Sequence, residues 1–176
     1  YLAVYPDGAF RPEGTITRGE FVRMINVIFN YEPGTVSNIF PDVPETAWYH
    51  RDVLAALEAG YIVGYPDGTF RPEGSITIEE AASVLDRILS LDLHISEVQA
   101  ASVVGINEVS PWANSSVRRI LFAGLMKPEA GKPFRTMEKI NRGQVAFACA
   151  RTLEKTAEKI YSAIVIPGMP GMVLSE

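Results

Sequence analysis

The clearest pattern of apolar and polar positions along the chain is a helical one that occurs three times. The apolar positions that recur at helical spacing are Phe21, Ile25 and Phe29; Ala81, Leu85 and Leu89; and Val145, Cys149 and Leu153. A capping box precedes each stripe, formed by Thr17 and Glu20, by Thr77 and Glu80, and by Asn141 and Gln144. The pattern predicts three amphipathic helices, none of which can bury its stripe alone.

The segments before these helices are copies of one another. Residues 5–20 read YPDGAFRPEGTITRGE and residues 65–80 read YPDGTFRPEGSITIEE, which are identical at 12 of 16 positions. A third, diverged copy appears when the second is shifted by 64 residues, because Trp48 then falls on Trp112 and Gly60 on Gly124. Such self-similarity is the signature of a repeat architecture.

Each full unit also predicts an opening helix and a loop. A helix is expected at about residues 48–59, with Gly60 as its left-handed C-terminal cap. Residues 65–75 then form a loop, in which residues 66–68 and 71–74 carry tight-turn signals. We therefore expect a mainly α fold, with three helix-loop-helix repeats in a pseudo-threefold arrangement around a central three-helix bundle.

Composition narrows the partners. The 176 residues carry a net charge of −5 and are 47% hydrophobic, so a packed core is expected and nucleic acid is not an expected partner. No stretch reaches the roughly 18 apolar residues that span a bilayer, so membrane insertion is not expected. The single cysteine, Cys149, excludes an internal disulfide; it aligns with Ile25 and Leu85 and is expected to be buried.

These motifs resemble the S-layer homology (SLH) domain family. The resemblance is carried by FPDV at residues 40–43, by Trp48, by AALEAGYIVGYPDGTFRPEGSIT at residues 55–77 and by ITRGE at residues 16–20. It implies one SLH module over residues 1–166, made of a partial repeat 1 (1–39), repeat 2 (40–103) and repeat 3 (104–166). Residues 167–176 are expected to form an irregular tail.

The resemblance also implies a function at the bacterial cell surface. SLH modules of secreted S-layer proteins and surface enzymes hold them noncovalently on the cell wall. Their ligand is a secondary cell-wall polysaccharide, often pyruvylated, which binds in grooves between repeats. The motif arginine is a main ligand contact. The implied ligand-binding residues are Arg18, Gly19, Glu20, Asp42, Trp48, Trp112, Arg142, Gly143 and Gln144.

Elementary chemistry is consistent with an anion at the first of these motifs. Arg18 follows the N-cap of its helix, where free N–H groups and a partial positive charge favour anions. A guanidinium adds a bidentate donor for a carboxylate, and Gly19 would leave space for a sugar. The alternative is that Arg18 and Arg142 are simply solvated.

The three copies are not equivalent. The position of Arg18 is held by Ile78 in the second copy, and Glu79 follows it, so that groove is expected to be inactive or altered. The first copy has no opening helix. The chain is then either part of a longer protein, or another chain or the tail fills the gap, as in a homo-oligomer or a domain swap.

Several residues have a structural interpretation beside the functional one. Trp48 and Trp112 are either core anchors of the opening helices or platforms for a sugar ring. Asp42 either caps the stretch before its helix or lines a groove. Glu20 and Glu80 are expected to be helix caps. The recurrent arginines are expected to brace their loops through local acids such as Glu73 and Glu13; these are Arg11, Arg71 and Arg135.

Catalytic chemistry has no support in the sequence. There is no nucleophile with its base, no phosphate loop and no metal spacing, so we expect a non-enzymatic module without a cofactor or metal. Two hypotheses remain. The first is wall anchoring through an anionic polymer. The second is a degenerate module that acts as a structural or protein-interaction scaffold of a larger surface protein.

Overall fold

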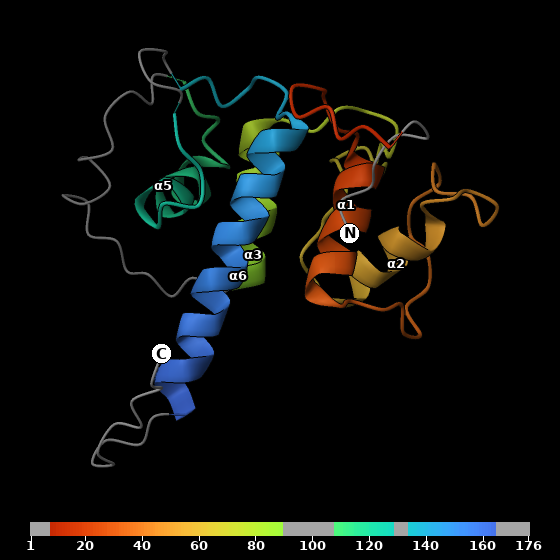
Figure 1. Cartoon of the computed structure of the whole chain (residues 1–176). Helices are drawn as coiled ribbons and strands as arrows, with labels where there is room; N and C mark the ends of the chain where they lie inside the picture. The colour runs from red at the N-terminus through yellow and green to blue at the C-terminus, as the bar shows by residue number, and fades with distance from the viewer. Residues whose placement is uncertain (1–7, 90–107, 129–133, 165–176) are drawn as a thin grey trace.

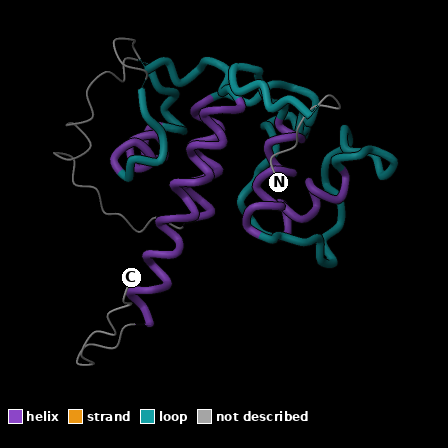
Figure 2. The backbone as a smooth tube through the Cα atoms, viewed as in Figure 1, coloured by secondary structure: helices purple, strands orange, loops and turns teal. Residues whose placement is uncertain are grey.

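The fold is built from helices joined by turns and loops. A computed structural model describes residues 8–89, 108–128 and 134–164. Its helices are α1 (Arg18–Phe29), α2 (His50–Glu58), α3 (Ile78–Leu89), α5 (Asn114–Phe122) and α6 (Arg142–Ile164). The described residues contain isolated β-bridges but no β-strand (Figure 2). The predicted mainly α class is therefore confirmed.

All three predicted capping boxes are present. The Thr17 hydroxyl accepts from the Glu20 N–H at 3.2 Å, and the Glu20 carboxylate accepts from the Thr17 N–H at 2.9 Å. Thr77 and Glu80 repeat this pair at 3.2 and 2.8 Å. Asn141 and Gln144 do so at 2.7 and 3.0 Å. The N-termini of α1, α3 and α6 are thus fixed by local sequence.

The opening helices are shorter than predicted. α2 begins at His50 rather than at residue 48, because its N-cap, Tyr49, offers no side-chain cap and the preceding residues form turns. The predicted C-terminal glycines are confirmed, with φ of +74° at Gly60 and +70° at Gly124. The second predicted turn is confirmed as well, since the Gly74 N–H donates to the Arg71 carbonyl at 3.1 Å.

The loops and helix N-termini interlock in cyclic order. The first two N–H groups of each capped helix donate to the loop of another copy. These bonds are Arg18 to Gly74 and Gly19 to Pro72; Ile78 to Glu138 and Glu79 to Thr136; and Arg142 to Gly14 and Gly143 to Pro12, at 2.8–3.0 Å. The first copy therefore docks on the second, the second on the third and the third on the first, at the end of the molecule where the loops gather (Figure 1).

The helices pack in pairs along the chain. α1 contacts α2, α3 contacts α5, and α6 contacts both α1 and α3 (Figure 1). α1 and α3 bring no Cα atoms within 8 Å of each other, so the contacts of α6 join them. The pseudo-threefold arrangement around a central bundle of three helices stays a prediction.

The predicted stripes form much of the core, with one exception. Phe21, Ile25, Leu85 and Cys149 are at most 2% exposed, whereas Leu153 at the end of the third stripe is 43% exposed. Burial raises the pKa of the Cys149 thiol to about 12, as expected for a small core side chain. α1 and α3 each carry a buried polar residue at one repeat position, Asn26 and Asp86. The equivalent residue of α6 is Ala150, which is exposed.

Some predictions fall outside the described residues. They include the irregular tail expected at residues 167–176. The repeat boundaries and the oligomeric completion of the first copy also stay predictions. Within the described part of the chain, no helix combines the length and apolar character that crossing a membrane requires.

Candidate functional site

Two hollows lie between neighbouring copies. The first, here called the Arg18 groove, has a volume of about 430 Å³. It is lined by Arg18, Ile62, Val63, Gly64, Tyr65, Pro66, Glu80, Ser83, Val84, Arg87 and Trp112. Sites for small ligands commonly occupy about 300–1,000 Å³, so this groove is large enough for one.

Arg18 forms the floor of its groove and is not a solvated side chain. It is 8% exposed, its Nε donates to the Phe70 carbonyl at 2.9 Å, and its guanidinium lies 4.8 Å from the ring centroids of Tyr65 and Phe70. Its Nη1 lies 3.6 Å from Oε1 of Glu80. The guanidinium is therefore held in one orientation with a partial counter-charge, and it lines the groove.

The helix N-terminus beside Arg18 is not open to an anion. The N–H groups of Arg18 and Gly19 donate to loop carbonyls, and that of Glu20 donates to Thr17. The expectation of free N–H groups is therefore wrong. Gly19 also leaves no space for a sugar, because a Cβ there would lie 3.2 Å from the Pro72 carbonyl and 3.3 Å from Tyr49 Cβ. Gly19 is small because Pro72 and Tyr49 approach it closely.

Tyr65 organises the wall of the Arg18 groove. Its hydroxyl donates to Glu80 at 2.5 Å, and its ring faces the guanidinium of Arg71 at 4.0 Å. Burial, together with the Glu80 hydrogen bond, raises the pKa of Tyr65. Arg71 braces the loop as expected, although its acid is Asp67, at 2.6 Å, and not Glu73.

Asp42 fixes the same loop from outside. Its Oδ1 accepts from the Phe70 N–H at 2.9 Å, and its Oδ2 accepts from the Arg71 N–H at 2.6 Å. Arg71 has φ of +57°, so these bonds hold a left-handed residue in place. Of the two interpretations of Asp42, a cap before its own helix is wrong, because its bonds span 28 and 29 residues of sequence. Asp42 also lies outside the linings of both grooves.

The two tryptophans are surface residues, so the core-anchor interpretation is wrong. Trp48 is 46% exposed and Trp112 is 59% exposed, since each lies before its helix begins. Trp112 lines the Arg18 groove. Trp48 lines a separate hollow of about 630 Å³ beside α1 and α2, where Arg23 lies 5.8 Å from its ring.

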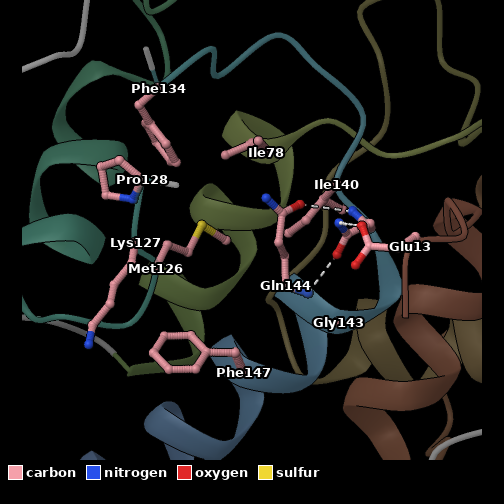
Figure 3. A pocket seen from close by; sticks show the side chains of 11 residues that line it. Glu13, Ile78, Met126, Lys127, Pro128, Phe134, Ile140, Gly143, Gln144 and Phe147 are labelled. Atoms are coloured by element: carbon pink, nitrogen blue, oxygen red, sulfur yellow. Dashed lines mark hydrogen bonds between the residues drawn. The ribbon is translucent and has the colours of Figure 1, made fainter. Parts of the chain in front are cut away.

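The second inter-copy hollow, here called the Ile78 groove, has a volume of about 350 Å³. It is lined by Glu13, Ile78, Met126, Lys127, Pro128, Phe134, Ile140, Asn141, Gly143, Gln144 and Phe147. Figure 3 shows Ile78, Phe134 and Met126 along one wall, with Gln144 and Glu13 at the opposite side. Gly143 and Gln144 thus belong to this groove, whereas Arg18 and Trp112 belong to the other.

Glu79 does not face this groove. Its side chain is buried and accepts from the Ser110 hydroxyl at 2.7 Å and from the Thr136 hydroxyl at 3.2 Å. The idea that its carboxylate repels an anion from the groove is therefore wrong. Ile78 alone replaces the arginine there.

Arg142 repeats the setting of Arg18. It is 5% exposed, its Nε donates to the Phe10 carbonyl at 3.0 Å, and its guanidinium lies 5.3 Å from the Phe10 ring. In the repeat, residues 2–6 correspond in sequence to residues 62–66, which line the Arg18 groove. Residues 2–6 lie outside the described part of the chain.

Sequence reasoning missed two residues of the Arg18 groove. Tyr65 was treated only as part of a turn, although Tyr5 repeats it in the first copy. Arg87 lines the groove from α3, and its Nη1 donates to the Tyr61 carbonyl at 3.3 Å. The shift of 64 residues that places Trp48 on Trp112 also places Arg87 on Arg151, which was the available signal.

Comparison with known proteins shows what this chain is similar to in sequence. The model of the S-layer homology domain matches residues 2–22 and 39–82. Cell surface glycoprotein 1 of Acetivibrio thermocellus is 28% identical over 165 residues, which cover 88% of this chain and 7% of that protein. The cellulosome-anchoring protein of the same species is 38% identical over 90 residues, 48% of this chain and 20% of that protein. Amylopullulanase of Thermoanaerobacterium thermosulfurigenes is 31% identical over 153 residues, 85% of this chain and 8% of that protein.

The interlocking copies and the hollows between them define a helical repeat module. Residues 2–22 and 39–82 of this module belong to the S-layer homology domain family. The chain spans between 7% and 20% of the length of these three relatives.

Proposed function

We propose that this chain anchors a protein noncovalently to the bacterial cell wall by binding an anionic, pyruvylated secondary cell-wall polysaccharide. The module acts at the outer surface of the cell and without catalysis. Any catalytic activity of a longer protein that contains it resides in other domains. The full set of proposed ligand residues is Arg18, Gly19, Glu20, Asp42, Trp48, Trp112, Arg142, Gly143 and Gln144; Tyr65 and Arg87 are added from the groove lining.

The observation that carries this proposal is the fixed guanidinium in the Arg18 groove. Packing against Tyr65 and Phe70 orients Arg18 before a ligand arrives, so little conformational entropy is lost on binding. Arg18 and Arg87 outnumber the single carboxylate that lines the groove among the described residues, that of Glu80. A ligand carboxylate would therefore meet a net positive charge in a partly dry site, where such pairs are strengthened.

The exposed indole of Trp112 completes the site for a sugar. Its position on the groove rim lets a flat aromatic face contact the C–H surface of a pyranose ring. In this proposal Gly19, Glu20, Gly143, Gln144 and Asp42 act by shaping the helix ends and the loops. Trp48 provides a second aromatic surface, in its hollow beside α1 and α2.

Cosedimentation with purified cell-wall sacculi tests this function. Wild type is expected to pellet with intact sacculi and to stay in solution with sacculi stripped of the polymer. Trp112→Ala and Arg87→Ala should each reduce pelleting, because they alter the groove lining. Arg135→Ala is the matched control, since Arg135 is exposed, is paired with Glu138 and lies outside both groove linings.

Pelleting of the Arg18→Ala variant is interpreted together with its thermal unfolding, because Arg18 also donates a hydrogen bond to the Phe70 carbonyl. A well-folded wild type that fails to pellet with polymer-bearing sacculi would overturn the proposal. The scaffold function, which the replacement of the motif arginine by Ile78 favours, would then be tested by a search for a protein partner.

A further inference from the structure

The two inter-copy grooves are the same site in two successive copies. Shifting by 60 residues places Arg18 on Ile78, and shifting by 64 places Ile62, Val63 and Gly64 on Met126, Lys127 and Pro128. All of these residues line their respective grooves. The grooves can therefore be compared at the repeat positions that line both of them.

Four substitutions change the chemistry between the two versions, and in one of them the apolar Val63 becomes the cation Lys127. The cation of Arg18 becomes the apolar side chain of Ile78, and the carboxylate of Glu80 becomes the amide of Gln144. Ser83 becomes Phe147, whose ring is 38% exposed. Both members of the Arg18–Glu80 charge pair are thus replaced by uncharged groups, and an aromatic surface is added.

We infer that the Ile78 groove binds an uncharged sugar residue of the same polysaccharide whose substituent ends in a methyl group, such as an acetamido group. This inference rests on the proposed function. One module would then recognise two kinds of unit, an anionic one in the Arg18 groove and an uncharged one in the Ile78 groove.

The buried wall of the groove is suited to a methyl group. Ile78, Met126 and Phe134 are each at most 7% exposed and line the hollow together (Figure 3). A carboxylate placed against these side chains would lose its water without gaining a guanidinium, which is costly. The methyl of an acetamido group loses nothing there and gains contact area.

The rest of the groove lining supplies partners for hydroxyl groups and for a ring face. Glu13, Gln144 and Lys127 carry polar groups of both signs, and their formal charges cancel. Phe147 offers its ring, with the Lys127 ammonium 5.5 Å from the centroid. An aromatic ring beside amide and carboxylate groups is the usual composition of a site for a neutral sugar, because the ring contacts C–H groups and the polar atoms bind hydroxyls.

Two small probes separate the grooves in solution. One is the methyl glycoside of N-acetylglucosamine, which is uncharged. The other is a methyl glycoside with a 4,6-linked pyruvate ketal, which carries a carboxylate. Amide chemical shifts of the whole chain are followed during titration. The neutral probe should shift signals near Phe147, and the anionic probe should shift signals near Trp112.

Matched aromatic variants assign each effect. Phe147→Ala should weaken the affinity for the neutral probe roughly tenfold and leave the affinity for the anionic probe unchanged. Trp112→Ala should do the reverse. Ile78→Arg should exchange the preference of its groove from the neutral to the anionic probe, because it restores the cation found at Arg18.

The possible failures are distinguishable. Neutral-probe binding that Phe147→Ala leaves intact, or no neutral-probe binding to a folded wild type, overturns the inference. Anionic-probe shifts near Phe147 in wild type also overturn it. If folded wild type binds the neutral probe near Phe147 but does not bind the anionic probe, the proposed function is overturned. The assignment of the Ile78 groove still stands in that case.

Discussion

Nη1 of Arg18 lies 3.6 Å from Oε1 of Glu80, and the two side chains belong to different copies of the repeat. Glu80 has three tasks at once. Its Oε2 caps α3 through the Thr77 N–H, and its Oε1 accepts from the Tyr65 hydroxyl while facing Arg18. The groove cation is therefore partly neutralised in the absence of a ligand.

The first prediction concerns Glu80→Gln. The capping box should survive, because Gln144 performs the same function at α6 with a bond of 3.0 Å. The free energy of unfolding should change by less than about 1 kcal/mol. Affinity for the anionic polymer should rise by roughly threefold to tenfold, because Arg18 loses a competing carboxylate. The measurement is the protein concentration at half-maximal pelleting with sacculi.

Glu138→Gln is the control for this substitution, because Glu138 is an exposed acid paired with Arg135. It should leave both affinity and stability unchanged. Weaker polymer binding by a stable Glu80→Gln variant would contradict the prediction, and it would mean that the Glu80 carboxylate accepts hydrogen bonds from the sugar itself.

A second prediction concerns the anchor of the groove loop. Asp42→Ala removes the acceptor of both the Phe70 and the Arg71 N–H groups. The expected loss is about 1–3 kcal/mol of unfolding free energy, measured by urea denaturation. Glu45→Ala, an exposed acid of the same segment, should have little effect. Equal stability of the two variants would show that water replaces the carboxylate without cost.

A third prediction concerns Asp86, which joins α3 to α5. This buried carboxylate accepts from the Ser116 hydroxyl at 2.7 Å and from Nε of Arg119 at 2.7 Å, and its bond raises the pKa of Arg119. Asp86→Ala should cost toward the lower end of about 3–5 kcal/mol, because it leaves Arg119 without its partner in a partly buried site.

The control for Asp86 is a surface pair of the same chemistry. Arg151 and Glu154 form an ion pair on α6 that is largely exposed. Glu154→Ala should cost less than about 1 kcal/mol. If denaturant unfolding gave the two variants the same stability, the burial of Asp86 would not be the source of its contribution.

The features that the sequence predicted correctly are those determined within a few residues. A capping box joins positions three apart, and a turn closes over four, so Thr17 with Glu20 and the bend ending at Gly74 follow from local chemistry. The stripe containing Phe21 and Ile25 is likewise a property of one helix. No knowledge of the other copies was needed for any of these.

The errors concern contacts between residues far apart in the sequence and the residue at which a helix begins. The N–H groups of Arg18 and Gly19 are free in an isolated helix, and they are occupied here only because residues 72–74 dock on them. For Trp112, the core-anchor interpretation failed and the alternative of a surface platform remains. Its helix begins two residues later, at Asn114, so the indole stays on the surface and reaches the groove. Arg87 was missed because its groove exists only after α3 and α5 pack.

The last prediction concerns the Cys149 thiol, which is 2% exposed on α6. Burial raises its pKa from 9.0 to about 12. The folded state therefore keeps the proton at a pH where the unfolded state releases it. The stabilisation that results is fully present below about pH 9 and is lost as the pH rises from 9 toward 12, by about 1.4 kcal/mol for each pH unit in that window. Comparison with Cys149→Ala isolates this contribution, because the buried Tyr61, whose pKa is also raised, titrates in both proteins.

In parallel, iodoacetamide should label native Cys149 at pH 8 only as fast as the protein unfolds, and labelling should become rapid in denaturant. Rapid labelling of the native protein would contradict the buried position of this side chain, and with it the packing of the third apolar stripe against α1 and α3.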